Sequence, residues 1–242
     1  MLIGCFSFYT IAHCSQHDKE QAEIEVIGVN MGKNRKNTKT YKKMQKLTTH
    51  YNFLDINLIN EINKYVKQSL YSPLWKTSHG WPLDVRLSTN PVAILELPDQ
   101  FTSVIHKRLK KTGLTWKKDN PPNKSLFYIY PPGGSIGWHD DVMYEFASII
   151  FISPAWNLDW GGLFLYEDLK GLGIRAEIPE FNKCLINSGG VPHGVSITSA
   201  HAPPRYVIIT FGPNVQGENK KKRGDKQWET WSKKRNIVKP KE

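Results

Sequence analysis

The feature that most constrains the fold is a series of short apolar segments between about residues 125 and 212. Each segment is rich in aromatic and β-branched residues, and proline, glycine or asparagine separates it from the next, as is typical of strands joined by turns. The segments are SLFYIY, FASIIFIS, GLFLYED, KCLINS, HGVSI and RYVIITFG. Six or more strands of this kind predict a mostly β domain, either a double-sheet jelly roll or a barrel.

The preceding residues, 51–112, have helical periodicity instead. Asp55 is the expected N-cap of a first helix, in which apolar residues recur every three or four positions. These residues are Ile56, Ile59, Ile62, Val66 and Leu70. A second helix is expected from near Pro98 to Gly113. Its expected packed face consists of Phe101, Val104, Ile105 and Leu109. Two helices ahead of the strands are expected to cover one face of a sheet.

The net charge of +11 is carried by the two ends of the chain. Residues 32–50 hold seven Lys or Arg and no acid, and residues 219–242 hold ten against three acids. Residues 51–218 hold fifteen of each sign. The expected parts are a flexible basic N-terminal extension (1–50), a folded domain (51–217) and a basic C-terminal tail (218–242). Such charge runs are typical of solvated ends, and attraction to nucleic acid or another anionic surface is the alternative.

Cysteine usage favours a reducing compartment, and hydropathy gives no sign of a membrane span. The three cysteines, Cys5, Cys14 and Cys184, have no regular spacing, so neither a disulfide framework nor a zinc signature is expected. Cys184 lies in an apolar alternation and is expected to be a buried thiol. The chain has no run of about 18 apolar residues, and its first residues lack the basic segment of a secretory signal. A cytoplasmic protein without a membrane span is therefore expected, with initiation at Met31 or Met44 as an alternative to a translated extension.

His139 and Asp141 are the first candidate metal ligands. They stand in the segment GWHDD, and alternate residues of an extended chain share one face. The imidazole and the carboxylate are therefore expected to point the same way, whereas Asp140 points to the opposite side. Two histidines and one carboxylate leave coordination positions open, which suits non-haem Fe(II). On its own, His-x-Asp is a weak signal, and a surface pair without metal is the ordinary interpretation.

Two residues further along the chain strengthen this signal. His193 begins the segment HGVSI and can supply a third ligand. Arg205 begins the apolar segment RYVIITF. An arginine that points into a core needs an anionic partner, because an unpaired buried charge is costly. A dicarboxylate held by the guanidinium fork meets this need, and an arginine that faces solvent on an edge strand is the alternative.

In their order, these residues resemble the prolyl 4-hydroxylase-like branch of the 2-oxoglutarate/Fe(II)-dependent dioxygenase superfamily. The resemblance covers roughly residues 125–212 and consists of YPPGGSIGWHDD, SIIFIS and WGGLFLY, followed by His193 and Arg205. It implies a double-stranded β-helix (jelly roll) covered by N-terminal helices. It also implies one iron held by His139, Asp141 and His193, and 2-oxoglutarate held by Arg205 and contacted by Tyr130. O2 is the implied second cosubstrate, and ascorbate is the implied reductant.

The implied reaction is hydroxylation of a C–H bond, coupled to decarboxylation of 2-oxoglutarate to succinate and CO2. A prolyl or other side chain of a protein or peptide is the first expectation for the substrate, and a free amino acid or small metabolite is the second. Nucleic-acid demethylation of the AlkB type fits less well, because that family has a further arginine at the position of Phe211. A jelly roll that binds without catalysing is also disfavoured, because none of the metal ligands is missing.

Departures from the family pattern bear on cosubstrate binding. The interval between the second histidine and the arginine is slightly longer than usual, which predicts an enlarged turn around residues 200–204. His201 lies in that turn and is expected to be a loop residue. Ile136 stands where many relatives have a second tyrosine, and Phe151 where some have a hydroxyl that reaches the distal carboxylate. Arg205 is therefore expected to carry more of the anchoring.

Overall fold

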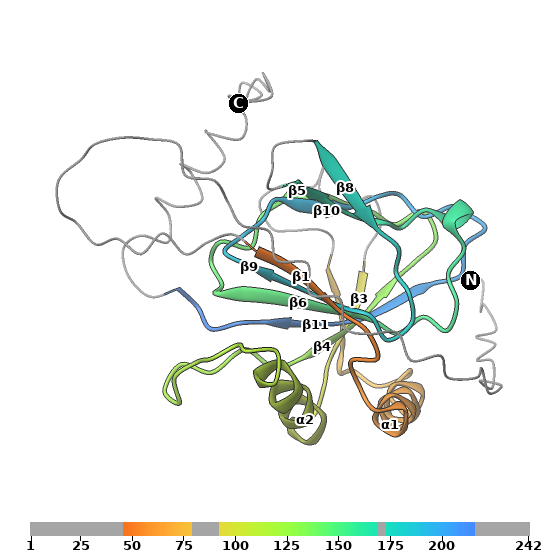
Figure 1. Ribbon diagram of the computed structural model, residues 1–242. Helices are drawn as coiled ribbons and strands as arrows, with labels where there is room; N and C mark the ends of the chain where they lie inside the picture. The colour runs from red at the N-terminus through yellow and green to blue at the C-terminus, as the bar shows by residue number, and fades with distance from the viewer. Residues whose placement is uncertain (1–45, 79–91, 169–172, 216–242) are drawn as a thin grey trace, which may run out of the picture.

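The computed structural model describes residues 46–78, 92–168 and 173–215, which form two antiparallel sheets and two α-helices (Figure 1). The helices are α1 (Ile56–Gln68) and α2 (Asp99–Lys110), with a short 3-10 turn η1 (Leu158–Trp160). The strands are β1 (Lys46–His50), β2 (Trp75–Ser78), β3 (Val92–Glu96), β4 (Leu126–Tyr130), β5 (Ile136–His139), β6 (Phe146–Phe151), β7 (Phe164–Glu167), β8 (Ile174–Glu177), β9 (Cys184–Ser188), β10 (His193–Val195) and β11 (Arg205–Phe211). Neither α-helix of these described ranges is long and apolar enough to cross a membrane.

The strands of the predicted β region are divided between the two sheets. The larger sheet has the order β1-β9-β6-β11-β4-β3-β2, and the smaller sheet has the order β5-β10-β7-β8. From β4 to β11 the chain passes repeatedly from one sheet to the other, as in a double-stranded β-helix. The predicted fold class is therefore confirmed.

Both faces of the larger sheet are covered, and alternate residues of its strands pack on opposite faces. Along β6, Ile150 contacts the helices, whereas Ile149 and Phe151 belong to the apolar cluster between the sheets. All six residues of β6 are buried for this reason. In Figure 1, α1 and α2 lie below the larger sheet, on the face away from β5 and β10. The helices thus support one face, and the other face is directed at the smaller sheet.

The helices begin close to the predicted residues. The carboxylate of Asp55 caps α1 by accepting a hydrogen bond from the Asn57 N–H at 2.8 Å. The buried side chains of α1 are Ile59, Ile62 and Val66. In α2, which follows Pro98, they are Phe101, Thr102, Ile105 and Leu109. Val104 was expected on this face but is 44% exposed. The buried face of α2 includes Thr102 in its place.

The prediction that residues 51–112 are helical is wrong for two segments. β2 and β3 lie between the helices and pair with each other, from Trp75 opposite Leu95 to Ser78 opposite Val92. β3 also pairs with β4 and so extends the larger sheet. A short apolar run such as VAILE fits a buried helical turn or a buried strand equally well. Only its pairing with β4 decides between them.

The expected start of the folded domain at residue 51 is also wrong. β1 pairs along its whole length with β9, from Lys46 opposite Ser188 to His50 opposite Cys184. Leu47 packs against the apolar cluster between the sheets. The segment KLTTH has no apolar periodicity, because every residue of this edge strand is only half-buried. Without that signal, the segment was grouped with the basic extension because it begins with a lysine. The remainder of that extension and of the basic tail lies outside the described residues.

Cys184 is fully buried in β9, as predicted. Its burial raises the pKa of the thiol well above the ordinary value. Cys184 is thus an inert core residue, and Cys5 and Cys14 lie outside the described residues.

Candidate active site

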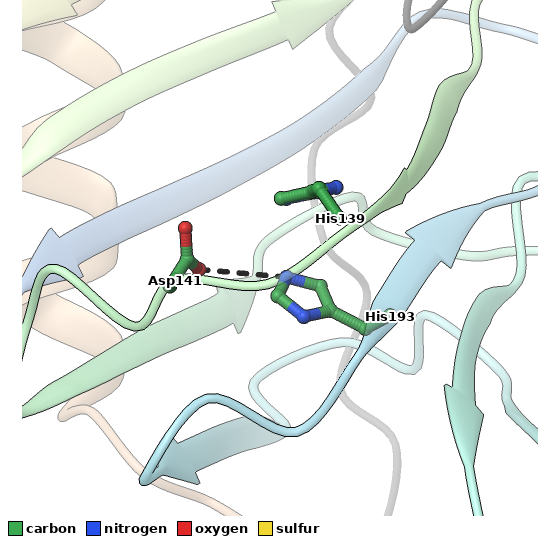
Figure 2. A group of neighbouring side chains, drawn as sticks. All are labelled: His139, Asp141 and His193. Carbon is green, nitrogen blue, oxygen red and sulfur yellow. Dashed lines mark ion pairs between the residues drawn. The ribbon is translucent and has the colours of Figure 1, made fainter. Parts of the chain in front are cut away.

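The pairing of β5 with β10 brings the three predicted ligands together. His139 lies directly opposite His193 in the smaller sheet, with ring centroids 4.3 Å apart. Asp141 follows the end of β5, and its Oδ2 lies 3.5 Å from Nε2 of His193. One possible ligand atom from each residue lies within 4.8 Å of the other two (Figure 2). His139 and Asp141 therefore converge as predicted, although β5 itself ends at His139.

The electrostatics of this cluster suit a metal site. Asp141 and His193 are buried, and His139 is half-buried. Burial, together with the neighbouring His139, lowers the pKa of His193 to about 4. His193 is therefore neutral near pH 7, which is the form of imidazole that binds metals. The ring of Phe164 stacks on His193 at a centroid distance of 5.1 Å and restricts its rotation.

Each histidine of the cluster has one ring nitrogen against a backbone carbonyl. Nδ1 of His139 lies 2.8 Å from the Gly137 oxygen, and Nδ1 of His193 lies 2.9 Å from the Val191 oxygen. Because a carbonyl oxygen only accepts, each Nδ1 carries the ring proton and leaves Nε2 as the donor for a metal. Two imidazole nitrogens and one carboxylate form the donor set of open Fe(II) sites. Within the described ranges, no other group of three His, Cys, Asp or Glu side chains converges in this way.

Arg205, the first residue of β11, points into the protein. Its side chain is 1% exposed, and its guanidinium carbon lies 4.9 Å from the ring centre of Tyr130 and 5.3 Å from that of Phe151. Both rings belong to the apolar cluster between the sheets, to which Phe164 beside His193 also belongs. The alternative of an arginine that faces solvent is thereby excluded.

The guanidinium of Arg205 lacks partners for part of its polar surface. Its Nε and Nη1 are buried and have no hydrogen-bond partner in the part of the chain that the structure describes. Burial lowers the pKa of Arg205 to about 10, and Tyr130 acts in the opposite direction. An uncompensated buried charge costs several kcal/mol, so a group of this kind calls for an anion. A carboxylate can accept two guanidinium N–H bonds at once, and a dicarboxylate cosubstrate therefore fits this position.

Gly162 provides room beside Arg205. A Cβ at this position would lie 2.7 Å from Cγ2 of Thr198, 3.1 Å from Cζ2 of Trp156 and 3.5 Å from Cδ of Arg205. Its φ of +63° also disfavours any side chain. The indole N–H of Trp156 donates to the Gly161 carbonyl at 2.8 Å, which holds this ring against the glycine pair. Close packing thus explains both glycines of the segment WGG, Gly162 against Arg205 and Gly161 against the backbone of Ile197.

The remaining sequence expectations concern the surroundings of Arg205. Tyr130 lies opposite Arg205 in the sheet and is 2% exposed, and burial raises the pKa of its hydroxyl to about 12. Phe151 is fully buried and offers no hydroxyl, and Ile136 packs against the cluster between the sheets.

The Ala202 N–H donates to the Ser199 carbonyl at 3.0 Å in the expected turn. His201 is exposed in that turn, outside the ligand cluster, as predicted.

Two contacts of His193 were not anticipated from the sequence. Phe164 stacks on its ring, and the amide Nδ2 of Asn187 lies 3.1 Å from its Nδ1. A signal was present for both. Apolar alternation along GLFLYED directs Phe164 inward, and Asn187 is a polar residue in the otherwise apolar segment CLIN. A buried amide of this kind requires partners, which identifies it as a candidate for a specific contact.

Comparison with known proteins finds similarity at the level of structure. No protein-family model and no curated protein sequence matches the chain. A prolyl-4-hydroxylase from Pseudomonas putida superposes with a TM-score of 0.55 and 15% identity, covering 71% of this chain and 94% of that one. A Trichoplax adhaerens prolyl hydroxylase, solved with a peptide of hypoxia inducible factor, superposes with a TM-score of 0.56 and 18% identity, covering 69% and 83%. An oxidoreductase of the 2OG-Fe(II) oxygenase family from Burkholderia pseudomallei gives 0.52 and 16%, covering 72% and 88%.

The superpositions include most of the length of each solved structure, so the similarity extends over a whole domain rather than one motif. The sequence identities are low, and the similarity therefore concerns the backbone arrangement. The chain has the double-stranded β-helix fold of the 2-oxoglutarate/Fe(II) oxygenases, with the prolyl hydroxylases among the structures that share it.

Proposed function

We propose that this protein is a 2-oxoglutarate-dependent Fe(II) dioxygenase that hydroxylates a C–H bond of its substrate. The observation that carries the proposal is the buried guanidinium of Arg205, whose Nε and Nη1 have no hydrogen-bond partner among the described residues. The guanidinium lies against the ring of Tyr130, and Tyr130 is also close enough to Asp141 of the ligand cluster that its pKa is raised by burial and by that carboxylate. An unpaired cation beside an open metal donor set is the combination that a chelating dicarboxylate requires.

In this proposal, His139, Asp141 and His193 hold one Fe(II). The metal supplies the activation of O2 that couples the decarboxylation of 2-oxoglutarate to hydroxylation. The protons on the two Nδ1 atoms keep the histidine rings oriented through the carbonyls of Gly137 and Val191. The stacked ring of Phe164 keeps water from one face of His193. The chain thus contributes a preorganised set of three ligands.

Arg205 anchors the cosubstrate in this proposal. Its guanidinium fork donates to the distal carboxylate of 2-oxoglutarate, while the rings of Tyr130 and Phe151 shield the ion pair from water. A low local dielectric strengthens such a contact. Tyr130 lies next to the guanidinium and is placed to contact the same carboxylate. Ascorbate is proposed as the reductant that keeps the iron in its ferrous state.

The proposed substrate is a prolyl or other side chain of a protein or peptide. The structure from Trichoplax adhaerens that shares the fold was solved with a peptide, which supports this class. The overall change converts one C–H bond, O2 and 2-oxoglutarate into an alcohol, succinate and CO2. One oxygen atom of O2 enters the alcohol, and the other enters succinate.

Succinate formation tests the proposal most directly. The purified full chain is incubated with Fe(II), ascorbate and 2-oxoglutarate, first alone and then with a library of proline-containing peptides. We expect slow succinate formation alone and faster formation with a substrate peptide, which gains the mass of one oxygen. Incubation with a pool of amino acids and small metabolites tests the second substrate class. Absence of any Fe(II)-dependent succinate formation would contradict the proposed function.

The catalytic unit is proposed to span residues 46–217, with the basic ends dispensable for chemistry. We expect a chain of residues 46–217 to retain 2-oxoglutarate turnover, because exposed charges act over roughly 8 Å at physiological salt. A chain of residues 51–217 is the matched comparison. It lacks β1 and exposes the edge of β9, so it should unfold at lower urea and aggregate more readily.

The same truncation also tests a role of the basic ends in substrate capture. If they attract an acidic partner, only turnover with that substrate should fall, and added salt should reproduce the loss in the full chain. Trp228 and Trp231 lie outside the described residues, in the removed tail. A 46–217 chain that is folded and binds iron, yet forms no succinate, would show that the tail belongs to the catalytic unit.

A further inference from the structure

Asn187 is a buried amide beside the ligand cluster that the proposed chemistry does not use. Its side chain is 3% exposed. Its Oδ1 accepts a hydrogen bond from the Val191 N–H at 2.9 Å, and its Nδ2 donates to the Val191 carbonyl at 2.9 Å. One side-chain amide therefore pairs with both polar groups of a single residue. This pairing closes the turn between β9 and β10.

The carbonyl that Asn187 holds is also the partner of a metal ligand. Nδ1 of His193 lies 2.9 Å from the Val191 oxygen and 3.1 Å from Nδ2 of Asn187. The amide of Asn187 cannot be reversed, because the Val191 N–H requires its oxygen. Nδ2 is therefore a donor, and the carbonyl oxygen is the acceptor in this triangle of three atoms. Both nitrogens donate to it, so Nδ1 of His193 keeps its proton and Nε2 remains available for a metal.

The turn closed by Asn187 also contacts the segment that carries the carboxylate ligand. Gly189 and Gly190 have φ values of +80° and +71°, which glycine adopts without strain. A Cβ at Gly190 would lie 2.5 Å from Cγ1 of Val142, the residue after Asp141. The position of the turn is thus linked to two of the three ligands, His193 and Asp141.

We infer that Asn187 is a positioning residue of the metal site: it holds the Val191 carbonyl where this fixes the tautomer and ring orientation of His193. The inference rests on the proposed function, since it concerns the same three ligands. Loss of an outer hydrogen-bond partner of a metal-binding histidine typically weakens metal affinity by about 10–100-fold. Metal affinity is therefore the property in which the role of Asn187 should appear.

Asn182 provides a matched control within the same fold. Its Oδ1 accepts from the Leu54 N–H and its Nδ2 donates to the Leu54 carbonyl, both at 2.8 Å. It is 6% exposed and thus buried to a similar degree as Asn187. The two asparagines make the same pair of bonds with a peptide group, but Asn182 contacts none of the three ligands through them. Replacing either one with alanine removes the same pair of bonds to a peptide group, and only the replacement of Asn187 should affect the metal site.

The experiment compares the full-length wild type, Asn187→Ala and Asn182→Ala. Each is titrated with Mn(II), and free Mn(II) is measured by its electron paramagnetic resonance signal without 2-oxoglutarate. We expect Asn187→Ala to bind Mn(II) about 10–100-fold more weakly, and Asn182→Ala to bind as the wild type does. Urea unfolding of the metal-free proteins should show a loss of stability in both variants, and a larger one in Asn182→Ala, because alanine disfavours the φ of +59° at this position. Equal Mn(II) affinity of Asn187→Ala and wild type, or equal weakening in both variants, would overturn the inference.

Asn187→Asp separates positioning from closure of the turn, and serves if Asn187→Ala does not fold. One carboxylate oxygen still accepts from the Val191 N–H, but the other replaces Nδ2, cannot donate to the Val191 carbonyl and repels its oxygen. This variant keeps one bond of the turn but no longer holds the carbonyl, so its Mn(II) affinity should fall as in Asn187→Ala. A folded Asn187→Asp protein that binds Mn(II) as the wild type does would overturn the inference. A wild type that binds no Mn(II) would instead overturn the proposed function itself.

Discussion

His193→Ala is expected to abolish Fe(II)-dependent succinate formation. The substitution leaves two of the three proposed ligands, and His193 is the one that both sheet pairing and stacking on Phe164 hold in place. Loss of an outer partner of a metal ligand already costs about 10–100-fold in affinity or activity, so loss of the ligand itself should exceed this range. His139→Ala should have the same effect on turnover. Succinate formation and Mn(II) binding are the two measurements.

The control for both variants is His201→Ala. His201 lies eight positions along the chain from His193 but is exposed in a turn, outside the ligand cluster. This variant should turn over 2-oxoglutarate as the wild type does. Circular dichroism should show that His193→Ala and His139→Ala keep their β structure. Full activity in either ligand variant would remove that histidine from the metal site.

Arg205→Lys is expected to weaken the binding of 2-oxoglutarate strongly. Lysine keeps the positive charge but loses the planar fork that donates two parallel hydrogen bonds to a carboxylate. A charge-assisted contact of this kind contributes about 1–3 kcal/mol, which corresponds to a KM higher by roughly 5- to 150-fold. The KM for 2-oxoglutarate is obtained from initial rates of succinate formation. An unchanged KM would place the distal carboxylate elsewhere.

Arg205→Met should separate binding from stability. Burial lowers the pKa of Arg205, so the folded chain binds its proton less tightly than the unfolded chain does. The charge therefore costs stability at neutral pH, where it is fully present. Replacing a buried charged group with an apolar one is often neutral or stabilising by about 1–4 kcal/mol. Arg205→Met should thus lose 2-oxoglutarate binding while it unfolds at the same or higher urea.

Arg175→Met is the comparison for this result. Arg175 lies on β8 in the smaller sheet, where its half-exposed side chain forms an ion pair with Asp168 at 3.1 Å. Its replacement should leave the affinity for 2-oxoglutarate unchanged and lower the free energy of unfolding. A marked loss of stability in Arg205→Met, greater than that in Arg175→Met, would indicate a structural role for Arg205 in place of cosubstrate binding.

The fold class and the candidate ligands were predictable because their signals are local. Buried strands such as β6 and β11 need apolar residues at nearly every position, which makes them visible in the sequence. His139 and Asp141 are two residues apart, so their proximity follows from the geometry of one chain segment. His193 and Arg205 required the longer order of motifs. His193 meets His139 only because β5 pairs with β10, which no local pattern specifies.

The strands that escaped prediction lie where burial is partial or length is short. β1 and β8 are edge strands with mixed composition, KLTTH and IRAE, and every residue of β1 is only half-buried. Neither has a partner on its outer side in the described sheets, and one-sided coverage does not demand a continuous apolar run. The pairing of β1 with β9 therefore came from the structure, and with it the earlier start of the folded domain.

The sequence by itself determined which groups are available: two imidazoles, a carboxylate and a guanidinium in the order typical of one oxygenase branch. Only the tertiary structure decided their state. Burial makes His193 a neutral imidazole, and closure of the two sheets leaves Nε and Nη1 of Arg205 without a partner among the described residues. The role of Asn187 likewise depends on a turn that brings Val191 back to it. These properties arise from desolvation and from contacts between distant strands, which exist only once the chain has folded.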